Sequence, residues 1–154
     1  NYVKVSGRLA EQLSKHFPED GAEIARRKEQ AILLVKKGSE ALVQKVTGAG
    51  LSGKPVIASS MQKEPLEWMG FMVVAEYGRQ EAMSTREVVR LADIGKDRGV
   101  IMVVDNIQSG PDAGKGIAET LRAPHVVLTN FPSERGYLAT LQENVDALLS
   151  AVRK

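Results

Sequence analysis

Hydrophobic residues recur at the steps of amphipathic helices in the first part of the chain. Val5, Leu9 and Leu13 stand four residues apart and predict a helix over residues 2–16. A proline-containing break follows, after which a longer helix is predicted over residues 22–46. Its hydrophobic positions repeat at intervals of seven and four residues, so they share one face. These positions are Ile24, Ala31, Val35, Leu42 and Val46.

Two further helices are predicted in the second half of the chain. The segment from Ser84 to Glu87 is a capping box, in which a hydroxyl and a carboxylate three residues apart satisfy free backbone amides at a helix start. The helix that follows is expected to end near Gly99. The last helix, over residues 137–153, carries a single apolar stripe made of Leu138, Leu141, Val145, Leu148 and Val152.

Four short apolar segments between these helices are predicted to be strands. They are Val56–Ser59, Phe71–Ala75, Val100–Val104 and Val126–Leu128. The third has no polar alternation, which is typical of a parallel strand covered on both faces. Shorter helices are expected over residues 64–69 and from Pro111 onward. The alternation of strands and helices predicts crossover connections and a mainly parallel sheet.

The predicted fold class is therefore α/β. We expect a three-layer α/β/α arrangement with a four-stranded mainly parallel sheet and a long spine helix. Residues 1–48 would form the short helix and the long connecting helix, and residues 49–154 the α/β lobe, within one compact unit overall. Ligands of such sheets bind beyond the carboxyl ends of the strands. These ends are the segments Ser59–Met61, Ala75–Tyr77, Asp105–Asn106 and Thr129–Asn130.

Composition excludes several classes of protein. The 21 basic and 19 acidic residues leave a net charge of +2, and aromatic residues make up 5% of the chain. A nucleic-acid binder needs a basic patch and often aromatic stacking platforms, so no nucleic-acid partner is predicted. The absence of cysteine excludes disulfides and thiolate metal sites. No apolar run reaches the roughly 18 residues of a membrane span.

Two glycine-rich segments come near to phosphate-binding loops without matching them. Gly48–Pro55 fits GxxxxGK[ST] except at its last position, where a proline replaces the hydroxyl residue. It also follows a helix rather than a strand, so we interpret it as a linker. Gly110–Gly116 has the wrong spacing, and Pro111 as the first helical residue explains it more simply. Free amides at such a helix start could still hold an anion.

Few side chains suit catalysis. His16 and His125 are not paired at a metal-binding spacing, and we interpret them as a helix-end and a strand-edge histidine. Glu76 and Asp105 stand at predicted strand ends and are candidates for lining a ligand cleft. No nucleophile or base accompanies them at a recognisable spacing, so no catalytic residue is predicted.

Five segments also match a known family in order and spacing. Phe17–Asp20 is similar to a short "DPEN"-like break before a long connecting helix, and Lys54–Ser59 to a strand that leads into a ligand position. Ser84–Val104 is similar to a helix followed by a "VKVIFVE"-like strand, Gly114–Leu121 to an "LAETIA" helix, and Tyr137–Leu148 to a closing "YLxxMxxNLDAL" helix. Together they resemble the metal-type solute-binding proteins of ABC transporters, the zinc and manganese receptors.

The resemblance implies the linking helix and the carboxy-terminal lobe of that family. The amino-terminal lobe, which supplies two ligands in the family, is missing from this sequence. Ser60 and Met61 stand where the family has a His or Glu ligand, and Asn130 stands where it has an Asp or Glu. Zinc and manganese depend on imidazole or carboxylate, so no metal ligand is assigned here. The cofactor stays unknown, with a divalent metal in the intact two-lobed protein, a soft ion at Met61 or a small organic ligand as alternatives.

The function implied by the resemblance is that of a non-enzymatic substrate-binding lobe in an extracytoplasmic ABC-type metal uptake receptor, periplasmic or on the cell surface. Its partners would be an ABC permease and the missing lobe. The face toward that lobe is expected to be partly apolar, so the isolated lobe would self-associate. Two alternatives remain. A stand-alone Rossmann-like small-molecule-binding module is favoured by Gly110–Gly116, and a protein-interaction domain by the uncharged Ser60 and Asn130.

Overall fold

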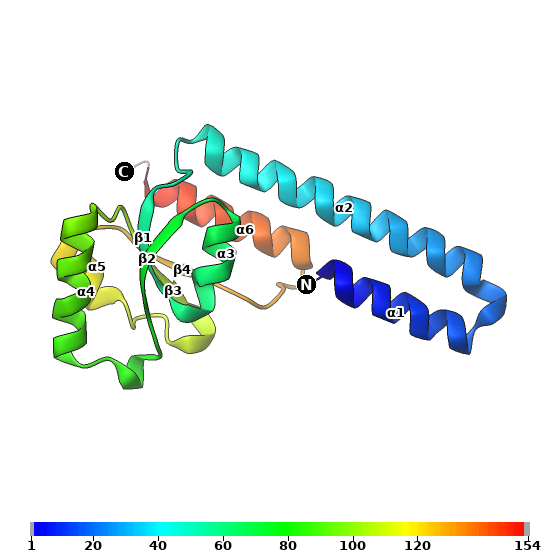
Figure 1. Ribbon diagram of the computed structural model, residues 1–154, viewed down its shortest axis with the longest axis horizontal. Helices are drawn as coiled ribbons and strands as arrows, with labels where there is room; N and C mark the ends of the chain where they lie inside the picture. Colours follow the sequence, from blue (N-terminus) through cyan, green and yellow to red (C-terminus); the bar gives the residue numbers. More distant parts are fainter. Residues whose placement is uncertain (1, 153–154) are drawn as a thin grey trace. The chain divides into compact units, whose positions relative to one another are not determined.

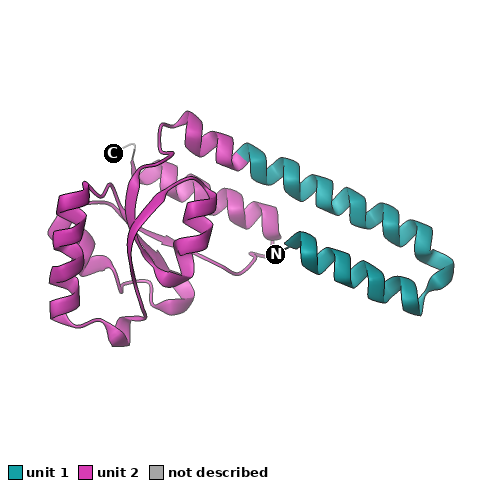
Figure 2. Ribbon diagram, viewed as in Figure 1, with its two compact units in different colours: residues 1–41 teal, residues 42–154 magenta. Residues whose placement is uncertain are grey.

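The computed structural model describes residues 2–152 and divides the chain into two compact units (Figure 2). Unit 1 ends at Ala41, and unit 2 begins at Leu42. The division falls inside α2 (Gly21–Gly48), whereas the boundary expected from the sequence follows the end of that helix. The last turns of α2 belong to unit 2 because Leu42 and Val46 are buried in its core.

Unit 1 is a helical hairpin (Figure 1). It consists of α1 (Tyr2–His16), a 3₁₀ turn (Pro18–Asp20) and the first part of α2. The bounds of α1 are those predicted. Pro18 begins the turn because its ring lacks an N–H and cannot continue the helix. Exposed ion pairs join Glu23 to Arg26 at 2.6 Å and to Arg27 at 2.7 Å.

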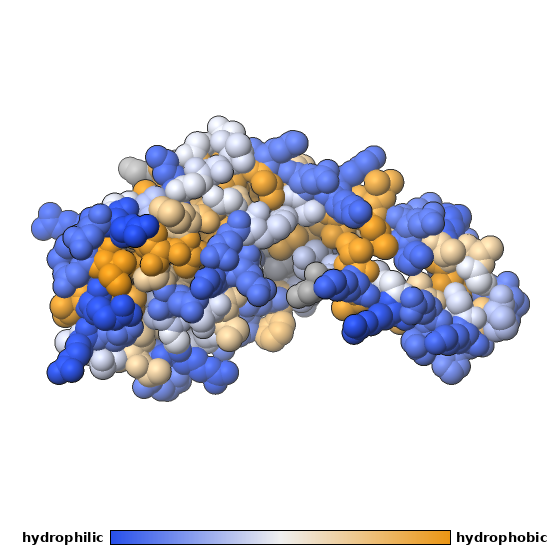
Figure 3. All heavy atoms as spheres, viewed as in Figure 1, coloured by the Kyte–Doolittle hydropathy of each residue, from blue (hydrophilic) through white to orange (hydrophobic). Residues whose placement is uncertain are grey.

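The apolar stripe of unit 1 is largely exposed to solvent. No described residue of this unit is buried, and Leu9 is 58% exposed. A groove of about 480 Å³ runs between α1 and the start of α2, lined partly by Leu9, Leu13 and Phe17. Figure 3 shows hydrophobic residues at the surface of this hairpin. Other exposed apolar side chains of the unit are Val3, Val5, Leu33 and Leu34.

Unit 2 contains a four-stranded sheet in the order β2-β1-β3-β4, and every pairing is parallel. The strands are β1 (Pro55–Ser59), β2 (Met72–Tyr77), β3 (Val103–Asn106) and β4 (His125–Leu128). The prediction of a four-stranded mainly parallel sheet is confirmed. The third strand begins at Val103 rather than at the predicted Val100, because Val100 N donates to Gly95 O and completes the end of the preceding helix.

Helices cover both faces of this sheet (Figure 1), which confirms the α/β/α arrangement. They are α3 (Lys63–Trp68), α4 (Thr85–Arg98), α5 (Lys115–Leu121) and α6 (Tyr137–Ala151). The last turns of α2 lie with α3 and α6 on one face, and α4 and α5 lie on the other. The predicted end of the last helix, residue 153, lies outside the described residues.

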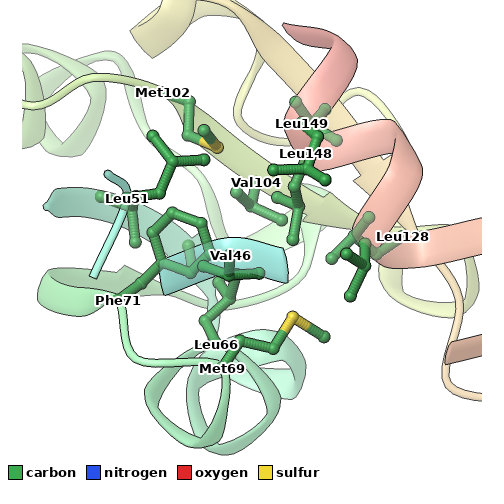
Figure 4. Packing of buried hydrophobic residues seen from close by; sticks show 14 of the residues in the cluster. Val46, Leu51, Leu66, Met69, Phe71, Met102, Val104, Leu128, Leu148 and Leu149 are labelled. Carbon is green, nitrogen blue, oxygen red and sulfur yellow. The ribbon is translucent and has the colours of Figure 1, made fainter. Parts of the chain in front are cut away.

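Each face of the sheet has its own apolar core. Figure 4 shows the larger one, in which Leu66 and Met69 follow β1 and pack near Leu128 and Leu148. On the other face, residues of β1, β2 and β3 meet α4 and α5. That smaller core contains Ile57, Tyr77, Leu91, Val103, Ala113, Ile117 and Ala118. Complete burial of one large aliphatic side chain contributes about 1.5–3 kcal/mol, so these two cores hold the sheet and its loops in place.

Local signals in the sequence correspond to the observed helix ends. Ser84 Oγ accepts a hydrogen bond from Glu87 N at 3.2 Å, and Gly99 ends α4 in the left-handed conformation, with φ of 63°. Residues 49–54 form a loop between Gly48, which ends α2, and Pro55, which begins β1, and this confirms the linker interpretation. The helix expected from Pro111 starts four residues later, at Lys115, because residues 111–114 form a turn in which Gly114 N donates to Asp105 Oδ2 at 2.9 Å.

Candidate functional site

Three loops gather at the carboxyl edge of the sheet in unit 2. Because β1, β3 and β4 are parallel neighbours, the segments that follow them leave the sheet on the same side. The first is the 3₁₀ turn Ser60–Gln62, the second is the 3₁₀ turn Ile107–Ser109, and the third begins at Thr129. We refer to these three loops as the carboxyl edge.

Asn130 connects the loops that follow β1 and β4. Its Nδ2 donates to Met61 O at 3.0 Å, and its Oδ1 accepts from Gln62 Nε2 at 2.9 Å. Ser60 precedes Met61 on the same turn, and the side chains of all three predicted ligand positions are exposed. The structure therefore brings Met61 and Asn130 into direct contact. Their role as ligand positions stays a prediction.

Further carboxamides extend this network, and sequence reasoning missed them. Gln108 Oε1 accepts from Asn130 N at 3.2 Å, and Gln108 Nε2 donates to Thr129 Oγ1 at 2.8 Å. Asn144 on α6 bonds both the N–H and the carbonyl of Thr129, at 3.2 and 2.8 Å. Gln62 lies three residues after the first predicted strand and Gln108 four residues after the third, and nothing in the sequence marks either side chain as a partner of Asn130.

Three buried polar atoms beside this network have no hydrogen-bond partner among the described residues. They are Ser59 Oγ, Gln62 Oε1 and Asn106 Nδ2. All three side chains are almost completely buried, with exposures of 1% or less. A buried polar group without a partner lowers the stability of the fold by about 1–3 kcal/mol. Binding of water or a ligand to each of these atoms would therefore be favourable. Ser59 ends β1 and Asn106 ends β3, which pairs directly with β1, and Gln62 lies on the turn that follows β1.

Asp105, a predicted cleft-lining residue, is fully buried on the side of the sheet that carries α5. Its Oδ1 accepts from the Tyr77 hydroxyl at 2.8 Å. Its Oδ2 accepts from Gly114 N at 2.9 Å and lies 2.6 Å from His125 Nε2. Burial and the charge of Asp105 raise the pKa of Tyr77 above its ordinary value. The carboxylate is thus satisfied within the fold, and its partners make it part of the scaffold beneath the edge.

The hydrogen bonds of Asp105 also bear on the expectation that free amides at the start of α5 could hold an anion. The Gly114 amide, which would be available to such an anion, donates to Asp105 instead. The helix itself has only 7 residues. Glu76, the other predicted cleft-lining carboxylate, is exposed and pairs with Lys63 at 3.2 Å. The two predicted cleft-lining carboxylates, Glu76 and Asp105, are therefore both engaged by partners from this chain.

The carboxyl edge also carries exposed apolar side chains. Met61 after β1, Ile107 after β3 and Phe131 after β4 are 53%, 53% and 67% exposed. Each stands next to a polar residue of the carboxamide network, so the edge combines amide groups with an apolar rim.

The donor set at the carboxyl edge does not fit zinc or manganese. Its predicted ligand positions offer a hydroxyl, a thioether and a carboxamide. Within residues 2–152, no three side chains of the His, Cys, Asp or Glu types gather closely enough to hold a metal ion. Among the helices described, none has both the length and the apolar character required to cross a bilayer.

Comparison with known proteins identifies the fold. No protein-family model matches the chain, and no curated protein matches its sequence. Several solved structures, however, match the chain. The laminin-binding protein Lbp of Streptococcus pyogenes aligns with 93% of this chain at a TM-score of 0.72 and 15% identity, over 58% of its own length. ZnuA aligns with 94% of this chain at 0.75 and 15% identity, over 55% of its length.

A manganese-bound periplasmic metal-binding protein from Candidatus Liberibacter asiaticus aligns with 99% of this chain, at a TM-score of 0.78 and 11% identity, over 60% of its own length. This chain thus spans between 55% and 60% of the length of these three proteins. The resemblance inferred from the sequence is confirmed at the level of the fold: the chain has the fold of the matching part of these three proteins.

Proposed function

We propose that this chain is the carboxy-terminal substrate-binding lobe, with its connecting helix, of an extracytoplasmic solute receptor for an ABC-type uptake system of the metal type. The observation that carries this proposal is the structural match. It covers 93% to 99% of this chain at TM-scores between 0.71 and 0.79. The matched proteins include ones described as periplasmic metal-binding proteins. We infer from that match a binding function without catalysis.

In this proposal the ligand binds at the carboxyl edge of unit 2. A second lobe would face the edge and cover its rim of Met61, Ile107 and Phe131, which are each more than half exposed. The closed form would then be presented to an ABC permease. In the absence of a second lobe, the same apolar rim would promote self-association of this lobe at high concentration.

The positions that correspond to metal ligands are degenerate in this proposal. The two amide atoms of Asn130 are engaged by Gln62 and Met61, and Ser60 has only a hydroxyl to offer. The Gln62–Asn130 hydrogen bond joins the loops after β1 and β4, a connection that a shared metal ion would otherwise provide. This lobe alone is therefore expected to hold no zinc or manganese.

The first experiment restores the missing chemistry at these positions. A Ser60→His, Asn130→Asp double variant places an imidazole and a carboxylate on the two loops. If both positions face one ligand site, native mass spectrometry should detect a one-to-one Zn²⁺ adduct in the double variant and none in the unmodified chain. Mn²⁺ and Cu⁺ are added in parallel, because Cu⁺ also tests the thioether of Met61.

The matched control is Ser39→His, Gln30→Asp, which introduces the same residue types on α2, nine residues apart and with no carboxylate or histidine three or four residues from either position. It should gain no adduct. Equal zinc binding by both double variants would mean that zinc binds at random to the surface. No adduct in the Ser60 and Asn130 variant would show that these positions do not share a metal site, and the proposed correspondence would be lost.

A further inference from the structure

The orientation of the amide groups at the carboxyl edge follows from the network itself. The carbonyl of Met61 accepts a hydrogen bond, so Asn130 must direct its NH₂ group toward it. Asn130 Oδ1 then accepts from the NH₂ group of Gln62. This order leaves Gln62 Oε1 as an acceptor with no partner. The unused acceptor is therefore required by the network.

An unused donor lies on the neighbouring strand end. Asn106 Oδ1 accepts from Ser109 Oγ at 3.2 Å, whereas Asn106 Nδ2 has no partner. Asn106 ends β3, and the turn that carries Gln62 packs against β3. One buried acceptor and one buried donor thus stand on adjacent elements. Both side chains are 0% exposed, and they stand beside the exposed loops of the carboxyl edge.

Two carboxylates near these two atoms are already engaged by groups of this chain. Glu76 is paired with Lys63, and Asp105 accepts three contacts inside the fold. No group of the carboxamide network carries a formal charge. An ionic ligand would lose its hydration without gaining an opposite charge in this lobe, which is unfavourable. An uncharged ligand loses much less hydration and meets the amide groups as a hydrogen-bond partner.

We propose that the carboxyl edge binds an uncharged organic ligand bearing a carboxamide or an equivalent donor–acceptor pair, held by Gln62 Oε1 and Asn106 Nδ2. The N–H of such a group donates to Gln62, and its carbonyl accepts from Asn106. An apolar part of the ligand contacts the rim of Met61, Ile107 and Phe131. The inference rests on the proposed receptor function and replaces a metal ion by a neutral molecule as the substrate class.

The test uses propionamide as the probe and propionate as its charged analogue. The ¹⁵N-labelled chain is titrated with each compound, and with Zn²⁺ separately, while the side-chain NH₂ signals of Gln62 and Asn106 are followed by NMR. Propionamide should shift both signals in a saturable way, in the millimolar range expected for a fragment of this size. Propionate and Zn²⁺ should leave them unchanged.

Substitutions at the two side chains identify where propionamide binds. Gln62→Met and Asn106→Leu each remove one hydrogen-bonding group while keeping approximately the same volume, and either should weaken propionamide binding about tenfold or more. Thermal unfolding shows whether each variant folds. If one of the two does not fold, the other still tests the proposal. Gln142→Met removes a carboxamide from α6, away from the edge, and should bind propionamide as the unmodified chain does.

Three results would overturn the inference. One is the absence of a saturable shift with propionamide, which would mean that water satisfies the two buried atoms. Another is an equal response to propionate. The third is a Zn²⁺-induced shift at Gln62 or Asn106, which would support a metal receptor while refuting a neutral ligand. The receptor proposal is tested separately by the Ser60 and Asn130 variant, so the failure of one does not imply the failure of the other.

Discussion

The two units of this chain use similar amphipathic helices with different results. In unit 2, Leu148 of α6 is 0% exposed and belongs to the core beneath the sheet. In unit 1, Leu9 of α1 occupies an equally regular stripe and is 58% exposed. A sheet offers a broad apolar face on which a helix can bury its stripe, whereas a two-helix hairpin has too little surface to do so. The comparison shows that periodicity predicts a helix and does not predict burial.

Polar interactions differ between the units in the same way. Glu23 in unit 1 bonds to Arg26 and Arg27 at the surface, and these hydrogen bonds lower its pKa to about 2. Surface pairs of this kind contribute little to stability because water screens them. Asp105 in unit 2 instead accepts from Tyr77 and Gly114 in the interior. Unit 2 is therefore expected to be sensitive to single substitutions, and unit 1 tolerant of them.

The largest expected difference comes from one substitution made in each unit. Leu148→Ala removes a side chain that is 0% exposed and should reduce the free energy of unfolding by about 2–5 kcal/mol. Leu9→Ala, also within a helix, should change it by less than about 0.5 kcal/mol. Urea denaturation followed by circular dichroism measures both. If Leu9→Ala costs as much as Leu148→Ala, the stripe of α1 is covered in solution and the comparison fails.

Replacing one glycine by alanine in each unit should change the free energy of unfolding by smaller amounts, and in opposite directions. At Gly114 a new Cβ would overlap the Tyr77 hydroxyl and approach Val103 Cγ1 within 2.7 Å, so Gly114→Ala should destabilise unit 2 by about 1–3 kcal/mol. At Gly7 in α1 nothing lies within 4 Å of the new Cβ, and Gly7→Ala should stabilise its helix by about 0.5–1 kcal/mol. Thermal unfolding of both variants shows whether each substitution stabilises or destabilises the protein. A neutral Gly114→Ala would show that Tyr77 can move aside.

The smallest expected effect depends on pH. The folded state raises the pKa of Tyr77 above its ordinary value of 10, mainly because the hydroxyl is buried and also because Asp105 is charged. The folded protein therefore keeps this proton when the unfolded chain loses it. The corresponding stability is complete below pH 10 and is lost as the pH rises above 10.

Removing the Tyr77 hydroxyl tests whether stability falls above pH 10 as derived. Tyr77→Phe should cost about 1–2 kcal/mol at neutral pH, because Asp105 loses a donor. Above pH 10 the difference from the unmodified chain should become smaller, since the variant has no proton to lose at this position. Urea midpoints measured between neutral pH and pH 11 give both quantities. A constant difference across this range would contradict the raised pKa of Tyr77.

Much of the fold could be predicted because its signals are local or periodic. The bounds of α1 were predicted to the residue, since Pro18 ends the pattern. The parallel sheet followed from the alternation of strands and helices. The start of α5 was wrong by four residues, because the turn before Lys115 is stabilised by the contact of Gly114 with Asp105, and that contact depends on the fold.

The candidate site was predicted only in part. The positions of Ser60, Met61 and Asn130 at one edge followed from the resemblance, and the structure brings Met61 and Asn130 together. The roles of Gln62 and Asn106 could not be predicted. A glutamine after a strand has no spacing that marks it as a binding residue, and its unused acceptor appears only when its neighbours in space are known.

The sequence by itself determined the type and order of the elements, the parallel sheet and the edge at which a ligand would meet it. Each of these depends on near neighbours in the chain or on a repeating pattern. Only the tertiary structure decided which apolar stripe is buried, that Asp105 faces Tyr77 and Gly114, and that carboxamides from separate loops join at the carboxyl edge. The physical reason is that burial and hydrogen-bond pairing depend on residues far apart in sequence, and those meet only in the folded chain.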